Sequence, residues 1–276
     1  MPIETNFIFS ANSFQDYLDC PRRFELKYLL KQNWPAEESE PVLEFEHNAE
    51  LGNRFHRMVH QYLNGVPQEI LLASIQDAAL HEWFANFHAF YSSRKFVQIF
   101  SEFSLRAVIN QSPLVAVCDL IALTADGNLW ILDWKTSAKK TRRENLNDRI
   151  QSILYPFIAL ECADRIFPDI RLQAENIHMA YLFVQHPADN LLTFDYSPDS
   201  HQQNRAFLTA TIGEILSKEP GTFECTAEAR RCRFCVYRSL CERGITAGNL
   251  AELEDASDLQ DTLSNLDFDA QEEIAF

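Results

Sequence analysis

The 276-residue sequence contains no uninterrupted run of 18 apolar residues, so no transmembrane helix is expected. Residues 1–14 also lack the basic segment followed by an apolar core that marks a secretory signal. We therefore expect a cytoplasmic protein without membrane contact. In that reducing compartment, the seven cysteines are expected to be thiols or metal ligands rather than disulfides.

Glycine is scarce, with 7 residues, which disfavours a glycine-rich nucleotide cradle. The helicase-type loop G-x-x-x-x-G-K-[ST] is absent, so any unwinding of a duplex must come from a partner. Positive charge is also in deficit, because the net charge is −16. Residues 250–276 carry nine acids and no Lys or Arg, so the net charge of residues 1–249 is about −7. The charge therefore weakens a nucleic-acid interpretation without excluding it.

The hydrophobic pattern predicts a mixed α/β chain with a central sheet of about five strands flanked by helices. We expect helices at 13–31, 51–63, 67–91, 148–163 and 198–218. We expect strands at 97–109, 114–124, 128–135, 177–185 and 190–196, with the apolar residues of 97–109 on one face. Pro21 should interrupt the first helix.

Residues 114–135 form the most informative segment, because two apolar strands are joined there by a turn containing Asp126-Gly127. Asp133 and Lys135 share one strand face, and the turn brings Asp119 near Asp133. Two neighbouring carboxylates repel each other unless a divalent cation lies between them. The alternative is an exposed salt-bridged trio, but nearly continuous apolar strands indicate a covered, central position.

This pattern resembles the PD-(D/E)XK nuclease superfamily, with Asp119 as the first acid and Asp133-Trp134-Lys135 as the second acid, any residue and lysine. Residues 52–56 resemble the GxxxH helix of its RecB-like branch, and residues 151–155 resemble its QxxxY helix. Glu102 lies where that branch often has a further acid. The motifs occur in the family order over residues 52–155.

The resemblance implies a restriction-endonuclease-like fold and assigns a role to each motif. His56, Asp119, Asp133 and the backbone carbonyl of Trp134 would hold Mg²⁺ or Mn²⁺. Lys135 would assist the attacking water and stabilise phosphate charge. Among the remaining residues, Glu102 would be an additional acid, and the DNA strand would be positioned by Gln151 and Tyr155.

Each motif also has a structural alternative. His56 borders an apolar helix stripe and would then be a packed core residue, and His60 one turn later would form an i, i+4 zinc pair with it. Arg57 follows His56, which departs from the H-E-x-x-H protease motif. The structural alternatives for the other motifs are an exposed strand acid for Glu102, a solvated helix residue for Gln151 and a core ring for Tyr155.

The cysteines form a second constellation, in which Cys232, Cys235 and Cys241 follow an x2, x5 spacing and Cys20 precedes Pro21. It resembles the iron–sulfur nucleases of the RecB-like branch, AddB-type subunits and CRISPR-adaptation exonucleases. That resemblance implies a [4Fe–4S] cluster that staples the N- and C-terminal helices together. A Cys₄ zinc site and Cys225 as fourth ligand are the alternatives. Core positions are expected for two further cysteines, Cys118 and Cys162.

We therefore expect a nuclease domain over residues 1–245, including the iron–sulfur region of Cys20 and 225–243, and an acidic tail over 246–276. The expected function is metal-dependent hydrolysis of DNA, as an exonuclease on single-stranded ends in repair, recombination or CRISPR adaptation, with a helicase or a repair or CRISPR partner. The alternatives are a non-catalytic iron–sulfur protein that binds DNA ends or acts as a scaffold, and a zinc-binding interaction protein. For the tail, a solvated terminus, a docked helix and a partner-binding peptide stay open.

Overall fold

The computed structural model describes residues 7–32 and 40–246, so most of the expected acidic tail lies outside the described residues. The helices are α1 (Ala11–Asp19), α2 (Pro21–Phe24), α3 (Glu40–Leu63), α4 (Gln68–Ala73), α5 (Ala78–Ser92), α6 (Arg143–Asn147), α7 (Ile150–Ile166), α8 (Pro198–Ser217) and α9 (Ala229–Cys232). A π-helical turn spans Glu25–Leu29, and 3₁₀ turns span Ala174–Asn176 and Arg238–Cys241. The strands are β1 (Phe9–Ser10), β2 (Phe96–Ile109), β3 (Ser112–Thr124), β4 (Leu129–Lys135), β5 (Ile177–Phe183) and β6 (Leu191–Asp195).

The strands form one mixed sheet in the order β1-β3-β4-β5-β6, with β2 also paired to β3. β3 pairs antiparallel with β2 and β4, whereas β4 and β5 pair in parallel through the α6–α7 crossover. The β3–β4 turn contains Gly127 at φ +82°, a conformation in which glycine avoids the strain of a side chain. The predicted mixed α/β architecture, with helices flanking a central sheet, is therefore confirmed.

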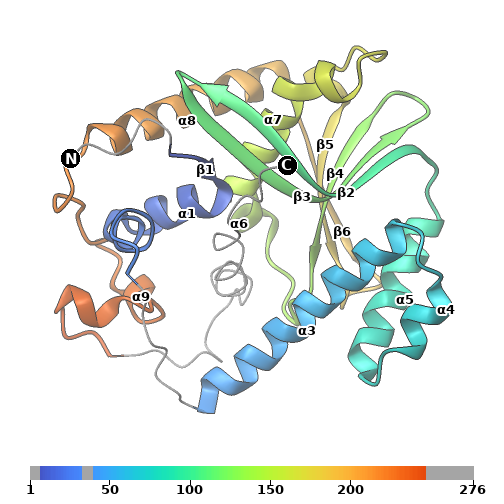
Figure 1. The fold of residues 1–276 in the computed structure, drawn as a ribbon, viewed down its shortest axis with the longest axis horizontal. Coiled ribbons are helices and arrows are strands. Elements are labelled where there is room, and N and C mark those ends of the chain that lie inside the picture. The colour runs from blue at the N-terminus through green and yellow to red at the C-terminus, as the bar shows by residue number, and fades with distance from the viewer. Residues whose placement is uncertain (1–6, 33–39, 247–276) are drawn as a thin grey trace, which may run out of the picture.

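Helices cover the two faces of the sheet as separate layers (Figure 1). α1, α7 and α8 contribute to one hydrophobic cluster, and α3, α4 and α5 contribute to the other. Strand β4 lies between them, with Leu129 and Ile131 in the first cluster and Leu132 and Trp134 in the second. β4 is therefore a covered central strand, as its apolar sequence predicts.

The predicted face of residues 97–109 is wrong, because the alternation of β2 reverses near Glu102. Leu105 and Ala107 belong to the α7-side cluster, whereas Ile99 packs against the α3-side cluster and Val97 is exposed. Glu102 has φ +48°, a left-handed conformation that costs a non-glycine residue roughly 1–2 kcal/mol. Because the backbone is left-handed at this one residue, the side chains after it point to the opposite faces of the sheet from those that regular alternation would give.

The same reversal occurs on β3. Cys118 and Ile121 both lie in the α7-side cluster, whereas Leu120 lies in the α3-side cluster. Strict alternation along β3 would put Asp119 on one face with Val117 and Ile121, but Val117 is exposed and Ile121 is buried in the α7-side cluster. Asp119 lies at the point where the alternation breaks.

The N-terminal helix also differs from its prediction. α1 begins at Ala11, and Ser10 caps it through a reciprocal pair of hydrogen bonds with Ser13. The helix ends at Asp19, and a second helix starts at Pro21, which confirms the expected interruption. The predicted start of the second helix at residue 51 is also wrong, because α3 begins at Glu40.

Among the helices that the structure describes, none combines the length and apolar character needed to cross a membrane.

The aromatic layer beneath α3 and α5 should be a main source of stability. Phe87 is fully buried, and its ring lies 5.2 Å from that of Trp134, centroid to centroid. Phe87→Ala should lower the free energy of unfolding by about 3–5 kcal/mol, because it removes a buried ring and leaves a cavity. Urea unfolding measures this change. Phe207→Ala, on the exposed side of α8, is the matched control and should cost less than about 1 kcal/mol.

Candidate active site

Three acidic residues form one row across the sheet. Ser101 pairs with Leu120 and Phe103 with Cys118, so Glu102 lies opposite Asp119. Leu120 pairs with Leu132, so the next position places Asp119 opposite Asp133. The row continues to β5, where Asp133 pairs with Tyr181. The sheet therefore brings together acids from three strands, at the place where the alternation of β2 and β3 breaks.

Asp119 is fixed by contacts on both carboxylate oxygens. Its Oδ2 accepts a 2.7 Å hydrogen bond from the backbone N–H of Trp134, and its Oδ1 lies 3.2 Å from Nδ1 of His56. Burial acts to raise the pKa of Asp119, but the charge of His56, its hydrogen bond and the Trp134 N–H together hold the pKa below its usual value. Asp119 is therefore ionised at neutral pH.

His56 projects from α3 toward this row. Burial acts to lower its pKa, but the charge of Asp119, the hydrogen bond to it and the charge of Asp133 raise the pKa to about 9. The imidazole is therefore a proton-bearing partner of Asp119 in the absence of a metal ion. A metal ion bound by this ring must displace that proton.

Lys135 connects the second acid to the helix that carries Gln151. Its Nζ lies 2.9 Å from Oδ2 of Asp133 and donates a 3.3 Å hydrogen bond to Oε1 of Gln151. Nε2 of Gln151 in turn donates to the hydroxyl of Tyr155, at 3.4 Å. The structure thus joins the predicted Asp133, Lys135, Gln151 and Tyr155 into one polar chain, and Tyr155 is also a buried core residue.

Two predicted residues, Glu102 and Trp134, make contacts of a different kind. The carboxylate of Glu102 lies 3.8 Å from Nδ1 of His60, and His60 also contacts Oγ of Ser101 at 2.9 Å. His60 therefore faces Glu102 and Ser101, whereas His56 faces Asp119. The backbone of Trp134 reaches the site through its N–H; a metal-binding role for its carbonyl stays a prediction.

The sequence interpretation missed Tyr181 and Ser152. The ring of Tyr181 lies beneath Lys135, with Nζ 5.4 Å from the ring centroid, and its hydroxyl lies 2.8 Å from Oγ of Ser152. Burial and the charge of Asp133 raise the pKa of Tyr181. Tyr181 therefore stays neutral, and its ring packs beneath the ammonium group of Lys135. The only signal in the sequence was that Ser152 directly follows Gln151.

The donor set of the row suits a hard divalent cation, because carboxylate oxygens and one imidazole are ligands of Mg²⁺ and Mn²⁺. In the described ranges 7–32 and 40–246, no three such side chains converge on a single ion position. Two of the three acids instead have a cationic neighbour, His56 for Asp119 and Lys135 for Asp133. The residues fit a divalent cation in chemical type, and binding one requires His56 to exchange its proton for the cation.

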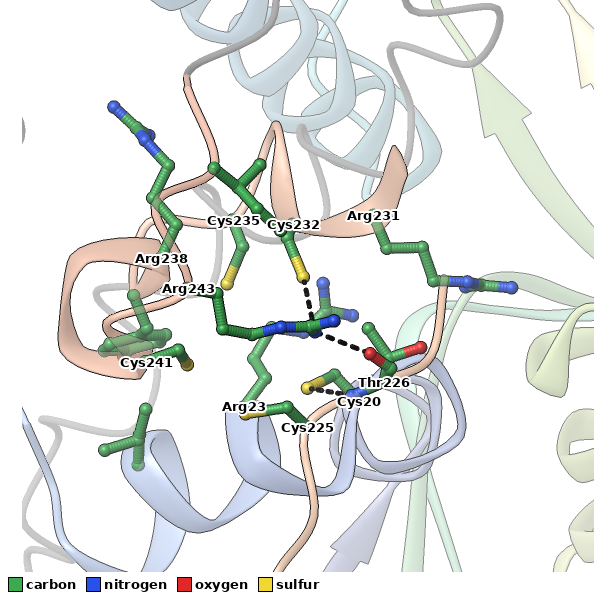
Figure 2. A pocket seen from close by; sticks show the side chains of 13 residues that line it. Cys20, Arg23, Cys225, Thr226, Arg231, Cys232, Cys235, Arg238, Cys241 and Arg243 are labelled. Atoms are coloured by element: carbon green, nitrogen blue, oxygen red, sulfur yellow. Dashed lines mark hydrogen bonds between the residues drawn. The ribbon is translucent and has the colours of Figure 1, made fainter. Parts of the chain in front are cut away.

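Cysteines from the N-terminal and C-terminal parts of the described chain line a pocket (Figure 2). Its thiols are those of Cys20, Cys225, Cys232, Cys235 and Cys241. Cys20 accepts a 3.4 Å hydrogen bond from the N–H of Thr226, and Cys232 accepts a 3.6 Å bond from Arg243. The other two, Cys118 and Cys162, are buried in the core, as predicted.

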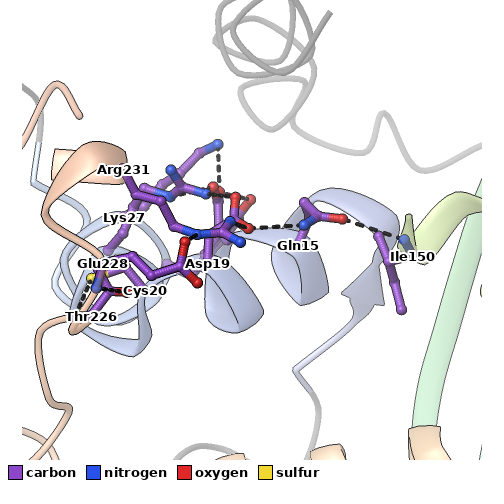
Figure 3. A network of polar contacts seen from close by, with 11 residues as sticks. Gln15, Asp19, Cys20, Lys27, Ile150, Thr226, Glu228 and Arg231 are labelled. Atoms are coloured by element: carbon purple, nitrogen blue, oxygen red, sulfur yellow. Dashed lines mark hydrogen bonds and ion pairs between the residues drawn. The ribbon is translucent and has the colours of Figure 1, made fainter. Parts of the chain in front are cut away.

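A polar network holds these chain ends together next to the pocket (Figure 3). Asp19 is ion-paired with Arg231 and with Arg23, the latter at 2.6 Å. Asp19 also accepts a 3.0 Å bond from Gln15, whose Oε1 accepts the N–H of Ile150. The network therefore runs from the cysteine pocket to the start of α7, directly before Gln151.

A family model of the PD-(D/E)XK nuclease superfamily matches residues 8–242. The chain belongs to this superfamily.

Two solved structures match most of the chain at low sequence identity. One is a protein from Eubacterium rectale assigned as an exonuclease, with 13% identity, a TM-score of 0.51, and coverage of 87% of this chain and 89% of that chain. The other is a protein named SSO0001, with 12% identity, a TM-score of 0.41, and coverage of 89% and 90%. No curated protein matches the chain.

Glu102→Gly separates the role of the carboxylate from that of the backbone. Glycine adopts φ +48° without strain, so the free energy of unfolding should stay within about 1 kcal/mol of the wild type. If the carboxylate takes part in metal binding, cleavage of labelled DNA with Mn²⁺ should fall by about 10-fold or more. Undiminished cleavage would show that Glu102 serves only the bend of the strand.

Proposed function

We propose that this chain is a divalent-metal-dependent nuclease that hydrolyses phosphodiester bonds of DNA. We further propose that it is an exonuclease on single-stranded ends, acting in repair, recombination or CRISPR adaptation. The observation that carries the proposal is the cross-strand row of Asp119 and Asp133, with His56 and Lys135 against it. Membership of the nuclease superfamily supports the reaction class.

The residues of the row divide the chemistry between them. Asp119, Asp133 and His56 would hold the cation, which when bound lowers the pKa of water and neutralises phosphate charge. Lys135 is buried and held by Asp133 and Gln151, so its ammonium is aimed at a fixed position. There it can orient the attacking water or stabilise charge on the phosphate. Gln151 and Tyr155 would hold the strand beside it.

A non-catalytic iron–sulfur protein that binds DNA ends or acts as a scaffold is the second candidate. The buried Asp133–Lys135 pair argues against it, because burying ions costs free energy that stable packing does not require. A binder that only recognises phosphates has no use for paired acids, which repel phosphate.

Asp133→Ala decides between these two functions. Loss of a metal ligand should reduce cleavage of 5′- and 3′-labelled single-stranded DNA by about 100-fold or more in Mg²⁺ or Mn²⁺. Asp164→Ala, on the exposed surface of α7, is the matched control and should cleave like the wild type. Folded Asp133→Ala protein with full activity would contradict the assignment, and an inactive wild type that still binds DNA ends would favour the binder.

We also propose that Cys20, Cys232, Cys235 and Cys241 hold a [4Fe–4S] cluster. All four thiols line one pocket, yet within the described parts of the chain no three of them converge on one ion. Zinc held by the same four cysteines is the alternative, which metal analysis of the purified protein distinguishes from a cluster. The N–H groups of Thr226 and Arg243 already donate to two of the sulfurs, as anionic thiolates require.

Cys225 is the rival fourth ligand, since it lines the same pocket from an exposed position. Burial, the hydrogen bond that the Cys241 thiol donates to Cys225 and the charge of Cys225 raise the pKa of Cys241 to about 12. Cys20 is instead buried, between the end of α1 and Pro21. We assign the ligand role to Cys20, which alone among the four comes from the N-terminal segment and would make the cluster a staple.

Matched cysteine variants test this assignment. Cys20→Ser should lose iron, sulfide and visible absorbance after anaerobic purification, and should melt at a lower temperature, because the closure between the chain ends is lost. Cys225→Ser should keep all of these properties. The reverse pattern would make Cys225 the ligand, and stoichiometric zinc without iron in the wild type would replace the cluster by a zinc site.

A further inference from the structure

The segment after the catalytic lysine carries an unusual charge for this chain. Residues 138–143, Ala-Lys-Lys-Thr-Arg-Arg, hold four cations and no acid in a protein of net charge −16. We call residues 138–143 the basic loop. Its position and its contacts decide what these charges can do.

The stretch of chain that contains the basic loop begins and ends at the candidate active site. The chain leaves the site at Lys135, passes through the basic loop and α6, and returns at Gln151. Lys135 and Gln151 are hydrogen-bonded to each other at 3.3 Å. The basic loop therefore lies in a connection whose two ends, Lys135 and Gln151, both lie at the row of acids.

Contacts within the segment fix its backbone. Thr136, Ser137 and Thr141 are buried. Oγ of Ser137 donates to the carbonyl of Lys139 at 2.9 Å, and Nε2 of Gln185 donates to the carbonyl of Thr136 at 2.6 Å. A ligand that binds this loop does not have to order a flexible segment first, so less entropy is lost.

Two of the four cations hold the loop on the β5–β6 hairpin. Nζ of Lys140 lies 2.6 Å from the carboxylate of Asp189 and donates to its carbonyl at 2.8 Å. Both terminal nitrogens of Arg143 donate to the carbonyl of Thr193, at 2.8 and 2.6 Å, and its guanidinium lies over the ring of Phe194. The charged groups of Lys140 and Arg143 therefore make contacts within the fold.

The other two cations, Lys139 and Arg142, are exposed. Within the described ranges, neither side chain has an ion-pair partner, in contrast to Lys140. Two such cations, held on a loop whose chain leaves the site at Lys135 and returns to it at Gln151, are complementary to the phosphates of a nucleic-acid backbone.

We propose that Lys139 and Arg142 bind consecutive phosphates of the single strand whose scissile phosphate lies at the row of acids. This inference rests on the proposed function and specifies its substrate contacts. Lys140 and Arg143 are positioning residues, because they act through the backbone of the loop. The contacts are to phosphates, so they give affinity and register but no base preference.

The test is the salt dependence of binding. Fluorescence anisotropy of a labelled single-stranded oligonucleotide, without divalent cations, should be measured between about 50 and 200 mM salt. In the full-length Lys139→Ala/Arg142→Ala protein, the slope of log K against log salt should be smaller than in the wild type by about 1.4, because each lost phosphate contact on a single strand removes about 0.7. The loss should be the same for all base sequences.

Lys95→Ala/Arg171→Ala is the matched control. Both residues are exposed and lie in the connections before β2 and after α7, and the variant has the same net charge as the loop variant. Its slope should equal that of the wild type. An unchanged slope in the loop variant, or an equal drop in the control, would overturn the proposal.

Measurements of binding and of cleavage distinguish a failure of the loop proposal from a failure of the nuclease proposal. Loop-dependent binding by a wild type that does not cleave DNA would uphold the loop proposal and remove the nuclease proposal. Cleavage by a protein whose DNA binding is indifferent to the loop would do the reverse.

Discussion

The hydrogen bond from the backbone N–H of Trp134 to the carboxylate of Asp119 is the contact on which the site depends. The backbone pairing of β3 with β4 ends at Leu120 and Leu132. Beyond that point, the N–H of Trp134 donates to the side chain of Asp119 instead of to a backbone carbonyl of β3. Asp119 is thereby tied to the strand that carries Asp133 and Lys135. Because the alternation of β3 breaks at the same residue, an acid can stand between two apolar clusters without being sealed into either.

Charge compensation explains how such a row is tolerated. His56 neutralises Asp119, and Lys135 neutralises Asp133, so the four groups carry little net charge. Buried ion pairs of this kind contribute little to stability, because desolvation offsets the attraction between the ions. The arrangement makes physical sense for a site that must exchange a proton for a cation and bring a fixed ammonium next to a phosphate.

The closure between chain ends gives the site a second support. Asp19 binds Arg23 and Arg231, and Gln15 extends this network to the N–H of Ile150, the first residue of α7. Since Gln151 follows immediately, the position of α7 is coupled to the contacts between the segments around Asp19 and Arg231. A cluster at the cysteines would reinforce a closure that side-chain contacts already make.

Short-range information in the sequence was sufficient for the types of most elements, the turn at Gly127, the covered strand β4 and the interruption at Pro21, because each follows from periodicity or from the local chemistry of a few residues. It did not show β1, the start of α3 at Glu40 or the break between α4 and α5 within the predicted helix 67–91. The sequence could not reveal that the alternation of buried and exposed side chains reverses at Glu102 and Asp119. Glu102 adopts a left-handed conformation, and no glycine marks that position in the sequence. The sequence also could not reveal Tyr181 beneath Lys135, or which cations of the basic loop are free. Those relations join residues from different strands and helices, and only the packing of the whole sheet decides them.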